Sequence, residues 1–258
     1  MTDPRAFHGK VAIITGAGSG IGRASAVLFA EHGAQLLLAG RREAPLAELA
    51  RLLGEAAVYL SVDVTKQHDN ERMFAEAQRK FGGCDIFVAN AGSEGVSELI
   101  ENYPMPVFDE VMSVNVRAVF LGLKCAMPIM RARGGGSIVI VSSIAGIKAR
   151  NTHNSAYVAA KHAQVGLMRT AALEGAPHGI RVNVVLPGPT ETEMVRRIEE
   201  SRSPGAPERT RAALLAQLPL KRYGTAEEVA QVIAFVASDA ASISTGAVFA
   251  ADGGLSAV

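Results

Sequence analysis

Short apolar runs alternate with helix-forming segments along the whole chain, and this alternation limits the folds that the chain can adopt. Runs of this kind are typical of strands buried on both faces, and helical connections between them give a parallel sheet covered on both sides. The sequence therefore predicts one α/β domain over residues 1–258, a Rossmann-like doubly wound parallel sheet of about seven strands. The expected strands are Lys10–Thr15, Gln35–Gly40, Ala57–Val62, Asp85–Ala89, Ser137–Val141, Arg181–Leu186 and Ala247–Ala251. The expected helices after the first one are Glu43–Leu53, Lys66–Phe81, a long helix from Pro104 to about Arg131, Ala156–Ala176 and Ala226–Ala237.

A glycine-rich turn, Thr15–Gly22, joins the first expected strand to the first helix. Its spacing, Gly16-x3-Gly20-x-Gly22, differs from the dinucleotide fingerprint G-x-G-x-x-G. Residues without a Cβ let a pyrophosphate approach the backbone, and the following helix N-terminus offers unpaired N–H groups. A tight turn without a ligand is the alternative for this stretch taken alone. The residues expected to hold a cofactor here are Gly16, Gly18, Ser19, Gly20, Ile21 and Gly22.

Polar residues or glycines follow the carboxyl ends of most of the expected strands. In a doubly wound sheet these ends meet at the crevice that binds the ligand. The convergence of several such segments therefore indicates a binding site more strongly than any one motif. They are Gly16–Gly22, Arg41, Asp63, Asn90–Gly92, Ser143 and Pro187–Gly188.

The composition excludes several classes of function. The net charge of +1, from 26 basic and 25 acidic residues, gives no electrostatic footprint for nucleic acid or an anionic membrane. No apolar run reaches the roughly 18–20 residues of a membrane helix, and the N-terminus lacks a signal-peptide core. Cys84 and Cys125 have no disulfide or metal spacing, and the histidines form no metal set. We expect a soluble, cytoplasmic protein with two reduced core thiols and no metal.

Tyr157 and Lys161 lie one helical turn apart in the helix expected over Ala156–Ala176. A tyrosine hydroxyl has a pKa of about 10, and a nearby ammonium lowers that pKa by favouring the phenolate. The pair therefore suits general acid–base catalysis. An exposed aromatic ring beside a solvated lysine is the alternative for the pair alone.

Taken together, these motifs resemble those of the short-chain dehydrogenase/reductase family in order and approximate spacing, from about Lys10 to Gly254. The family implies seven parallel strands, hydride transfer between a nicotinamide and a carbonyl or alcohol, and a homotetramer, with a dimer also possible. The matching positions are Thr15-Gly16-x3-Gly20-x-Gly22, Asn90-Ala91-Gly92, Asn115, Ser143, Tyr157-x3-Lys161 and Pro187-Gly188.

The resemblance also implies roles for individual residues. Tyr157 would exchange a proton with the substrate oxygen, and Ser143 would hydrogen-bond that oxygen. Lys161 would bind the nicotinamide ribose and lower the pKa of Tyr157, and the Asn115 backbone would anchor a water that links Lys161 to solvent. The remaining implied cofactor contacts are Asp63, Val64, Asn90, Ala91, Gly92, Pro187, Gly188, Thr190 and Thr192.

The chain departs from the family between the serine and the tyrosine. The segment from Ser143 to Tyr157 is one residue longer than is common, and we place the extra residue in the loop Ile147–Asn154. Ser142 is the alternative for the serine's role.

The end of the second strand decides between the two nicotinamide cofactors. An acidic residue there would bind both ribose hydroxyls and repel a 2′-phosphate. This chain has Gly40 instead, followed by Arg41 and Arg42, whose guanidinium groups suit a phosphate. Ser19 stands where many NADP-dependent members carry a basic residue. The sequence favours NADP(H) and leaves NAD(H) possible.

The segment 190–223 is charged and proline-spotted, and we expect a mobile substrate lid with a solvated charged outer face. The chain resembles reductases of cyclic ketones, including levodione-type diketone reductases, and also 3-oxoacyl-ACP reductases. We expect a small or medium apolar ketone or secondary alcohol. A catalytically silent NADP-binding regulator and an isomerase or dehydratase are the other hypotheses; the filled Ser143, Tyr157 and Lys161 positions speak against the regulator.

Overall fold

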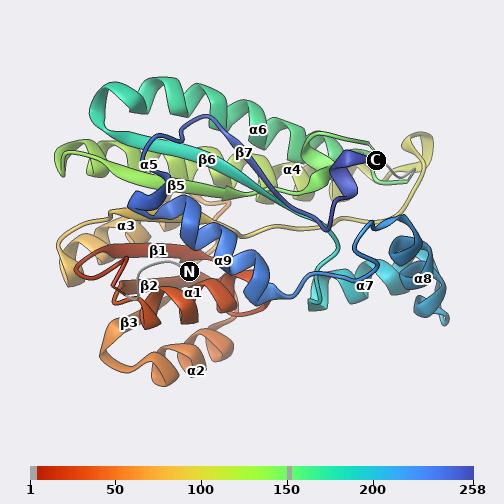
Figure 1. Cartoon of the computed structure of the whole chain (residues 1–258), viewed down its shortest axis with the longest axis horizontal. Helices are drawn as coiled ribbons and strands as arrows, with labels where there is room; N and C mark the ends of the chain where they lie inside the picture. The colour runs from red at the N-terminus through yellow and green to blue at the C-terminus, as the bar shows by residue number, and fades with distance from the viewer. Residues whose placement is uncertain (1–4, 150–152) are drawn as a thin grey trace.

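The computed structural model describes residues 5–149 and 153–258 and shows a seven-stranded parallel sheet between two layers of helices (Figure 1). The strand order is β3-β2-β1-β4-β5-β6-β7, so the chain reverses direction across the sheet between β1 and β4. The predicted doubly wound α/β fold is confirmed. The strands are β1 Val11–Thr15, β2 Gln35–Gly40, β3 Ala57–Ser61, β4 Ile86–Ala89, β5 Gly136–Val141, β6 Ile180–Pro187 and β7 Val248–Ala251.

The helices divide between the two faces of the sheet because strand side chains alternate between them. On β1, Ala12 and Ile14 pack in the core cluster on one face, whereas Ile13 packs in the cluster on the other. The first face is covered by α1 Gly20–Glu31, α2 Glu43–Leu53 and α9 Ala226–Ala237. The second is covered by α3 Gln67–Phe81, α5 Ala118–Ala132 and α6 Ser155–Gly175, and α4 Met105–Met112 packs against α6. Two further helices, α7 Glu193–Arg202 and α8 Pro207–Gln217, lie beyond the carboxyl ends of the strands.

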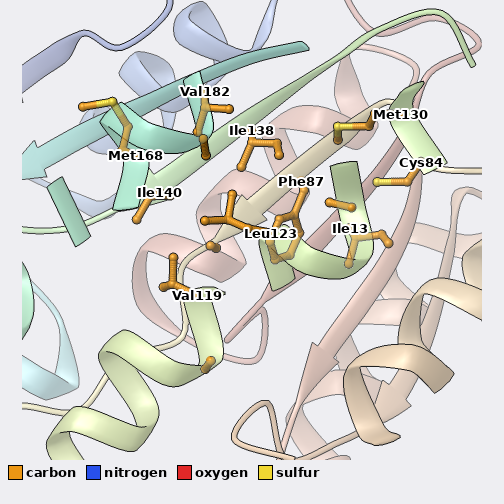
Figure 2. Close-up of a cluster of buried hydrophobic side chains, with 14 of the residues drawn as sticks. Ile13, Cys84, Phe87, Val119, Leu123, Met130, Ile138, Ile140, Met168 and Val182 are labelled. Atoms are coloured by element: carbon orange, nitrogen blue, oxygen red, sulfur yellow. The ribbon is translucent and has the colours of Figure 1, made fainter. Parts of the chain in front are cut away.

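The core between the sheet and α3, α5 and α6 is built from interlocking apolar side chains (Figure 2). Phe87 on β4 lies at its centre, and its ring fills the space beside Gly122 of α5, where a Cβ would lie 2.6 Å from the ring. Cys84 is fully buried in this cluster, and burial raises the pKa of its thiol. Cys125 is only partly buried, so the expectation of two core thiols holds for one of them.

The long helix predicted from Pro104 to about Arg131 is interrupted. A π-helical turn, Ser113–Arg117, separates α4 from α5. The 28-residue stretch Met105–Ala132 contains an 18-residue window with a mean hydropathy of 1.3, so by length and composition it could cross a membrane, a property that the sequence analysis did not predict. Core helices of soluble proteins share this composition, and here α5 packs its buried face against the sheet and α3.

Candidate active site

The carboxyl ends of β1 and β4 are tied together at the point where the chain reverses across the sheet. The Thr15 hydroxyl accepts the backbone N–H groups of Asn90 and Ala91 at 3.0 and 3.1 Å. The Asn90 amide donates to the Thr15 carbonyl at 2.9 Å. These bonds explain why a threonine precedes the glycine turn and an asparagine follows β4. They fix the floor of the ligand crevice expected at a topological switch point.

The glycine turn between β1 and α1 leaves no room for a side chain at Gly16 or Gly22. Gly16 and Gly20 have φ of +66° and +51°, in the left-handed region that glycine favours. A Cβ on Gly22 would lie 2.3 Å from the Gly16 carbonyl oxygen. The N-cap residue of α1, Ser19, makes no side-chain capping bond, so its helix N-terminus keeps donors for an anion.

One cavity of about 800 Å³ runs from this turn across the strand ends to α7. Most residues that the sequence assigns to the site line it, and they come from all parts of the chain. The structure brings together Gly16, Gly18, Ser19, Gly20, Ile21, Arg41, Arg42, Asp63, Val64, Asn90, Ala91, Gly92, Ser143, Tyr157, Lys161, Pro187, Gly188, Thr190 and Thr192. Gly22 and Asn115 lie behind its wall. Within the described ranges, no group of three or more His, Cys, Asp or Glu side chains is placed to hold a metal ion.

The two adjacent serines at the end of β5 have different partners. The Ser143 hydroxyl is hydrogen-bonded with Tyr157 and also accepts the Ala145 N–H at 3.2 Å. The Ser142 hydroxyl donates to the Lys161 backbone carbonyl at 3.2 Å and is buried. The geometry therefore pairs Ser143 with the tyrosine hydroxyl. The longer loop before Tyr157 includes residues 150–152, which lie outside the described residues.

The protein groups around Tyr157 raise the pKa of its hydroxyl. Burial raises the pKa to about 12, the hydrogen bond with Ser143 lowers it, and the Glu94 carboxylate raises it. The Lys161 Nζ lies 5.4 Å from the centroid of the tyrosine ring. The lysine is 3% exposed, and burial lowers the pKa of its ammonium to about 7.

The two arginines after β2 are both exposed at the cavity rim but differ in their contacts. Arg42 donates to the Ser19 hydroxyl at 3.3 Å and forms a 3.8 Å ion pair with Glu193 at the start of α7. Arg41 lies close enough to the Asp63 carboxylate to contribute to lowering the pKa of that group. Asp63 in turn accepts the Thr65 N–H and hydroxyl at 3.0 and 2.8 Å.

Several charged side chains of the segment 190–223 form ion pairs and hydrogen bonds within the protein. Arg197 on α7 donates to Glu94, in the loop after β4, at 2.6 Å. Glu199 is 5% exposed and accepts the Tyr223 hydroxyl at 2.9 Å. Arg211 on α8 stacks over the Tyr223 ring at 4.4 Å and pairs with Glu191. The expectation of solvated charges is therefore wrong at Glu199, whose carboxylate is buried among these partners.

This arrangement agrees with what the chain resembles among known proteins. The family model described as Enoyl-(Acyl carrier protein) reductase matches residues 16–256. The chain belongs to the short-chain dehydrogenase/reductase family. It is an NAD(P)-dependent oxidoreductase of the branch whose members act on ketones and alcohols.

The similar proteins extend over nearly the full chain. Levodione reductase of Leifsonia aquatica is 40% identical over 97% of this chain and 96% of its own length. Cis-4-hydroxycyclohexanecarboxylate dehydrogenase of Sinomonas cyclohexanicum is 39% identical over 98% and 99%. The 3-oxoacyl-[acyl-carrier-protein] reductase FabG of Thermotoga maritima is 38% identical over 96% and 98%. A crystal structure of levodione reductase superposes with a TM-score of 0.95 at 38% identity, covering 98% of this chain and 99% of that one.

Several residues of the site are not found by sequence reasoning. Glu94 lines the cavity and acts on Tyr157, and Gln164 contacts Lys161 from the next turn of α6. Pro45 and Leu46, at the start of α2, also line the cavity beside the glycine turn. A glutamine three residues after the lysine, in a helix that is otherwise apolar on that side, is a signal that the sequence offers for Gln164. No such signal exists for Glu94, because its position depends on how its loop packs.

Proposed function

We propose that this oxidoreductase transfers a hydride between NADP(H) and a small or medium apolar ketone or secondary alcohol, with Tyr157 as general acid and base. One observation carries the proposal: the Tyr157–Ser143 hydrogen bond faces the same cavity as the glycine turn of β1 and α1. A proton-exchanging group and a phosphate cradle thus share one enclosed space.

The side chains of the site suit the proton transfer. In reduction, the Tyr157 hydroxyl donates its proton to the substrate oxygen; in oxidation the phenolate takes a proton from the alcohol. The Ser143 hydroxyl donates to the same oxygen and stabilises the negative charge that develops on it. The buried Lys161 ammonium, 5.4 Å from the tyrosine ring, favours the phenolate. Asn115 supports the lysine indirectly, because its backbone carbonyl accepts the Gln164 amide, whose oxygen in turn accepts the lysine ammonium.

The residues present fit a dinucleotide. A Cβ at Gly16 or Gly22 would collide with the Asn90 amide or the Gly16 carbonyl, so the turn keeps the backbone bare where a pyrophosphate binds. Gly18, Ser19, Gly20 and Ile21 would present their N–H groups to it. When bound, the nicotinamide supplies the hydride or accepts it.

Other cavity residues would hold the two ends of the dinucleotide. Asp63 and Val64 would flank the adenine, and Asn90, Ala91 and Gly92 would line the adenosine side. Pro187, Gly188, Thr190 and Thr192 would line the nicotinamide side; Thr192 caps α7, and its methyl group lies beside Gly20.

The rim beside β2 supports a preference for NADP(H). Gly40 places no carboxylate where one would repel a 2′-phosphate. The Arg41 guanidinium is exposed at the cavity rim, and Arg42 lies beside it, partly engaged by Ser19 and Glu193. Both can approach a phosphate from the strand end.

The substrate end of the cavity supports an apolar substrate of small or medium size. Its aliphatic lining comes from α4, α6, α7 and α8, from the loop after β4, from the π-helical turn and from the turn after β5: Val96, Val107, Val114, Ile144, Val158, Met194, Val195, Ile198 and Leu214. A 3-oxoacyl carrier-protein substrate needs basic residues outside the cavity for the acidic carrier. The segment 190–223 offers only two short basic groups, Arg196–Arg197 and Arg209–Arg211, and in each group one arginine is engaged within the chain, Arg197 by Glu94 and Arg211 by Glu191.

We also propose that residues 190–223 act as a lid and that the protein is a homotetramer. The two helices α7 and α8 border the cavity, and their closure would exclude water from the reacting atoms. The family resemblance implies that the two long helices, α5 and α6, pack against their symmetry mates, and both expose a large apolar side chain, Phe120 on α5 at 53% and Leu173 on α6 at 78%. Light scattering of the purified protein measures the subunit number directly.

The proposed activity is tested with the purified chain, NADPH or NADH, and a carbonyl panel of cyclic ketones, sugars and acyl thioesters. We expect oxidation of NADPH by cyclic ketones, followed by absorbance. Tyr157→Phe removes only the transferable proton, so kcat falls by about 10²–10⁴-fold while cofactor affinity is retained. Full residual activity in this variant contradicts the acid–base role. Cofactor binding without turnover on the whole panel favours the silent-regulator alternative.

A further inference from the structure

The Asn115 carbonyl accepts a hydrogen bond from outside its own helix. Asn115 lies in the π-helical turn Ser113–Arg117, where the regular backbone ladder is disturbed. Its carbonyl oxygen accepts the side-chain amide of Gln164, on α6, at 2.7 Å. The Asn115 side chain meanwhile donates to the Ser93 carbonyl at 2.9 Å and accepts the Ser93 N–H at 3.3 Å. Asn115 therefore joins the loop after β4 to the middle of α6.

Gln164 continues this chain of contacts to the lysine. Its Oε1 accepts Lys161 Nζ at 3.2 Å, and the whole residue is 0% exposed. The amide has one possible orientation here, because an ammonium only donates and a backbone carbonyl only accepts. Gln164 thus bridges Lys161 and the Asn115 carbonyl with both ends of one buried amide.

The bridge limits where the lysine can point. Lys161 Nζ has three N–H donors, of which the Gln164 Oε1 and the Val141 carbonyl, each at 3.2 Å, accept two. One N–H is left for the cavity that Tyr157 lines. In the described part of the chain, no carboxylate forms an ion pair with Lys161, so neutral acceptors stabilise the charge.

Titratable side chains from other elements also line the cavity that holds Lys161 and Tyr157. Besides Tyr157 on α6 itself, the cavity is lined by Glu94 from the loop after β4, Glu110 from α4 and Lys148 after β5. Burial alone lowers the pKa of Lys161, and Glu94 acts on the pKa of Tyr157.

We propose that Gln164 is a positioning residue that stabilises the charged form of Lys161 and directs its remaining N–H to the cavity. This inference rests on the proposed function, in which Lys161 supports Tyr157. The Gln164 amide also stands between Lys161 and the Asn115 carbonyl, where the family resemblance implies a water.

The test uses the full chain with Gln164→Met, which keeps the length of the side chain and removes both hydrogen bonds. Asn183→Leu is the matched control, because Asn183 is an equally buried amide that bonds the Ser244 carbonyl and the Ala247 N–H far from the lysine. The first readout, Tm against pH, needs neither cofactor nor substrate. The second is kcat against pH for alcohol oxidation with the best substrate of the panel.

The lowered pKa of Lys161 determines how the change in Tm of Gln164→Met depends on pH. A lysine whose folded-state pKa is about 7 contributes stability that rises from there toward its unfolded pKa of about 10.4. Loss of an acceptor is felt while the ammonium is charged and fades above that pKa. We expect Gln164→Met to lower Tm by about 2–4 °C more at about pH 6 than at about pH 9. Asn183→Leu lowers Tm equally at both.

For oxidation, the phenolate of Tyr157 is the reactive form, and a weakened ammonium stabilises it less. We expect kcat to fall by about 10–100-fold, its rising limb to move about one pH unit upward, and KM to stay within about twofold. A pH-independent loss of Tm with an unmoved kcat limb overturns the proposal. Wild type inactive on the whole panel instead refutes the proposed function, while the Tm comparison still decides whether Gln164 holds the charged lysine.

Discussion

Arg197 and Glu94 join the two sides of the substrate end of the cavity. The guanidinium, on α7, donates to the carboxylate, in the loop after β4, at 2.6 Å across 103 residues of sequence. The Arg197 side chain is 59% exposed and that of Glu94 18%. The pair connects the proposed lid to the loop that Asn115 holds through Ser93.

Removing the Arg197 guanidinium would loosen the proposed lid and leave every side chain that contacts the reacting atoms in place. Because the pair is partly exposed, its contribution is small, and we expect Arg197→Ala to raise KM by up to about fivefold with little change in kcat. Added salt shrinks the difference between wild type and variant by screening the pair. Steady-state kinetics at two ionic strengths measures both effects; a large drop in kcat shows that Arg197 acts on the reacting atoms instead.

The adjacent serines give a second, internally controlled prediction. Ser143→Ala removes the hydroxyl that bonds Tyr157, so kcat is expected to fall by about 10²-fold or more with Tm nearly unchanged. Ser142→Ala removes a buried hydrogen bond to the Lys161 carbonyl, so it lowers Tm by a few degrees, the effect of roughly 1–2 kcal/mol. Kinetics and thermal melts on both variants distinguish the two serines. The reverse pattern assigns the substrate contact to Ser142.

Much of the fold is predictable because its boundaries are set locally. The bounds Gln35–Gly40 and Glu43–Leu53 agree with those predicted. Gly33 and Gly54, both with positive φ, follow the ends of α1 and α2, and such turns leave a clear sequence signal. The π-helical turn at Asn115 leaves none, because its residues continue the apolar period of the helix around it.

The residues of the site also fall into those that the sequence predicts and those that it does not. Residues at the carboxyl ends of strands are predicted to converge because a parallel sheet brings all those ends to one edge. The contacts of Glu94 with Arg197 and of Gln164 with Asn115 are not predicted, since they depend on how helices and loops pack over that edge. Sequence reasoning thus finds the groups at the strand ends and the motif residues Asn115, Tyr157 and Lys161, and misses the contacts of Glu94 and Gln164 with them.

The cofactor preference is tested at the two arginines after β2. Arg41→Ala removes an exposed guanidinium at the rim, and we expect NADPH to bind about 10–100-fold more weakly while NADH binding is unchanged. Arg42→Ala is the control: its guanidinium is already engaged by Ser19 and Glu193, so its effect is smaller. Fluorescence titration of both variants with NADPH and with NADH gives four dissociation constants, which are compared with those of the wild type. Equal losses for NADPH and NADH in Arg41→Ala show that Arg41 does not bind the 2′-phosphate.

The glycine turn permits the sharpest steric test. A Cβ at Gly22 would lie 2.3 Å from the Gly16 carbonyl oxygen and 2.5 Å from the Asn90 amide nitrogen, and neither can move without disturbing the strand ends. We therefore expect Gly22→Ala to abolish binding of both nicotinamides and to lower Tm.

The matched control for that change is Gly166→Ala on α6, where a Cβ meets nothing within 4 Å. Alanine in a helix interior is favoured over glycine by about 1 kcal/mol, so this variant keeps cofactor affinity and melts at the same or a higher temperature. Calorimetric titration with NADPH and a thermal melt on both variants make the comparison. Undiminished binding in Gly22→Ala means that the cofactor phosphates lie elsewhere than on the turn between β1 and α1.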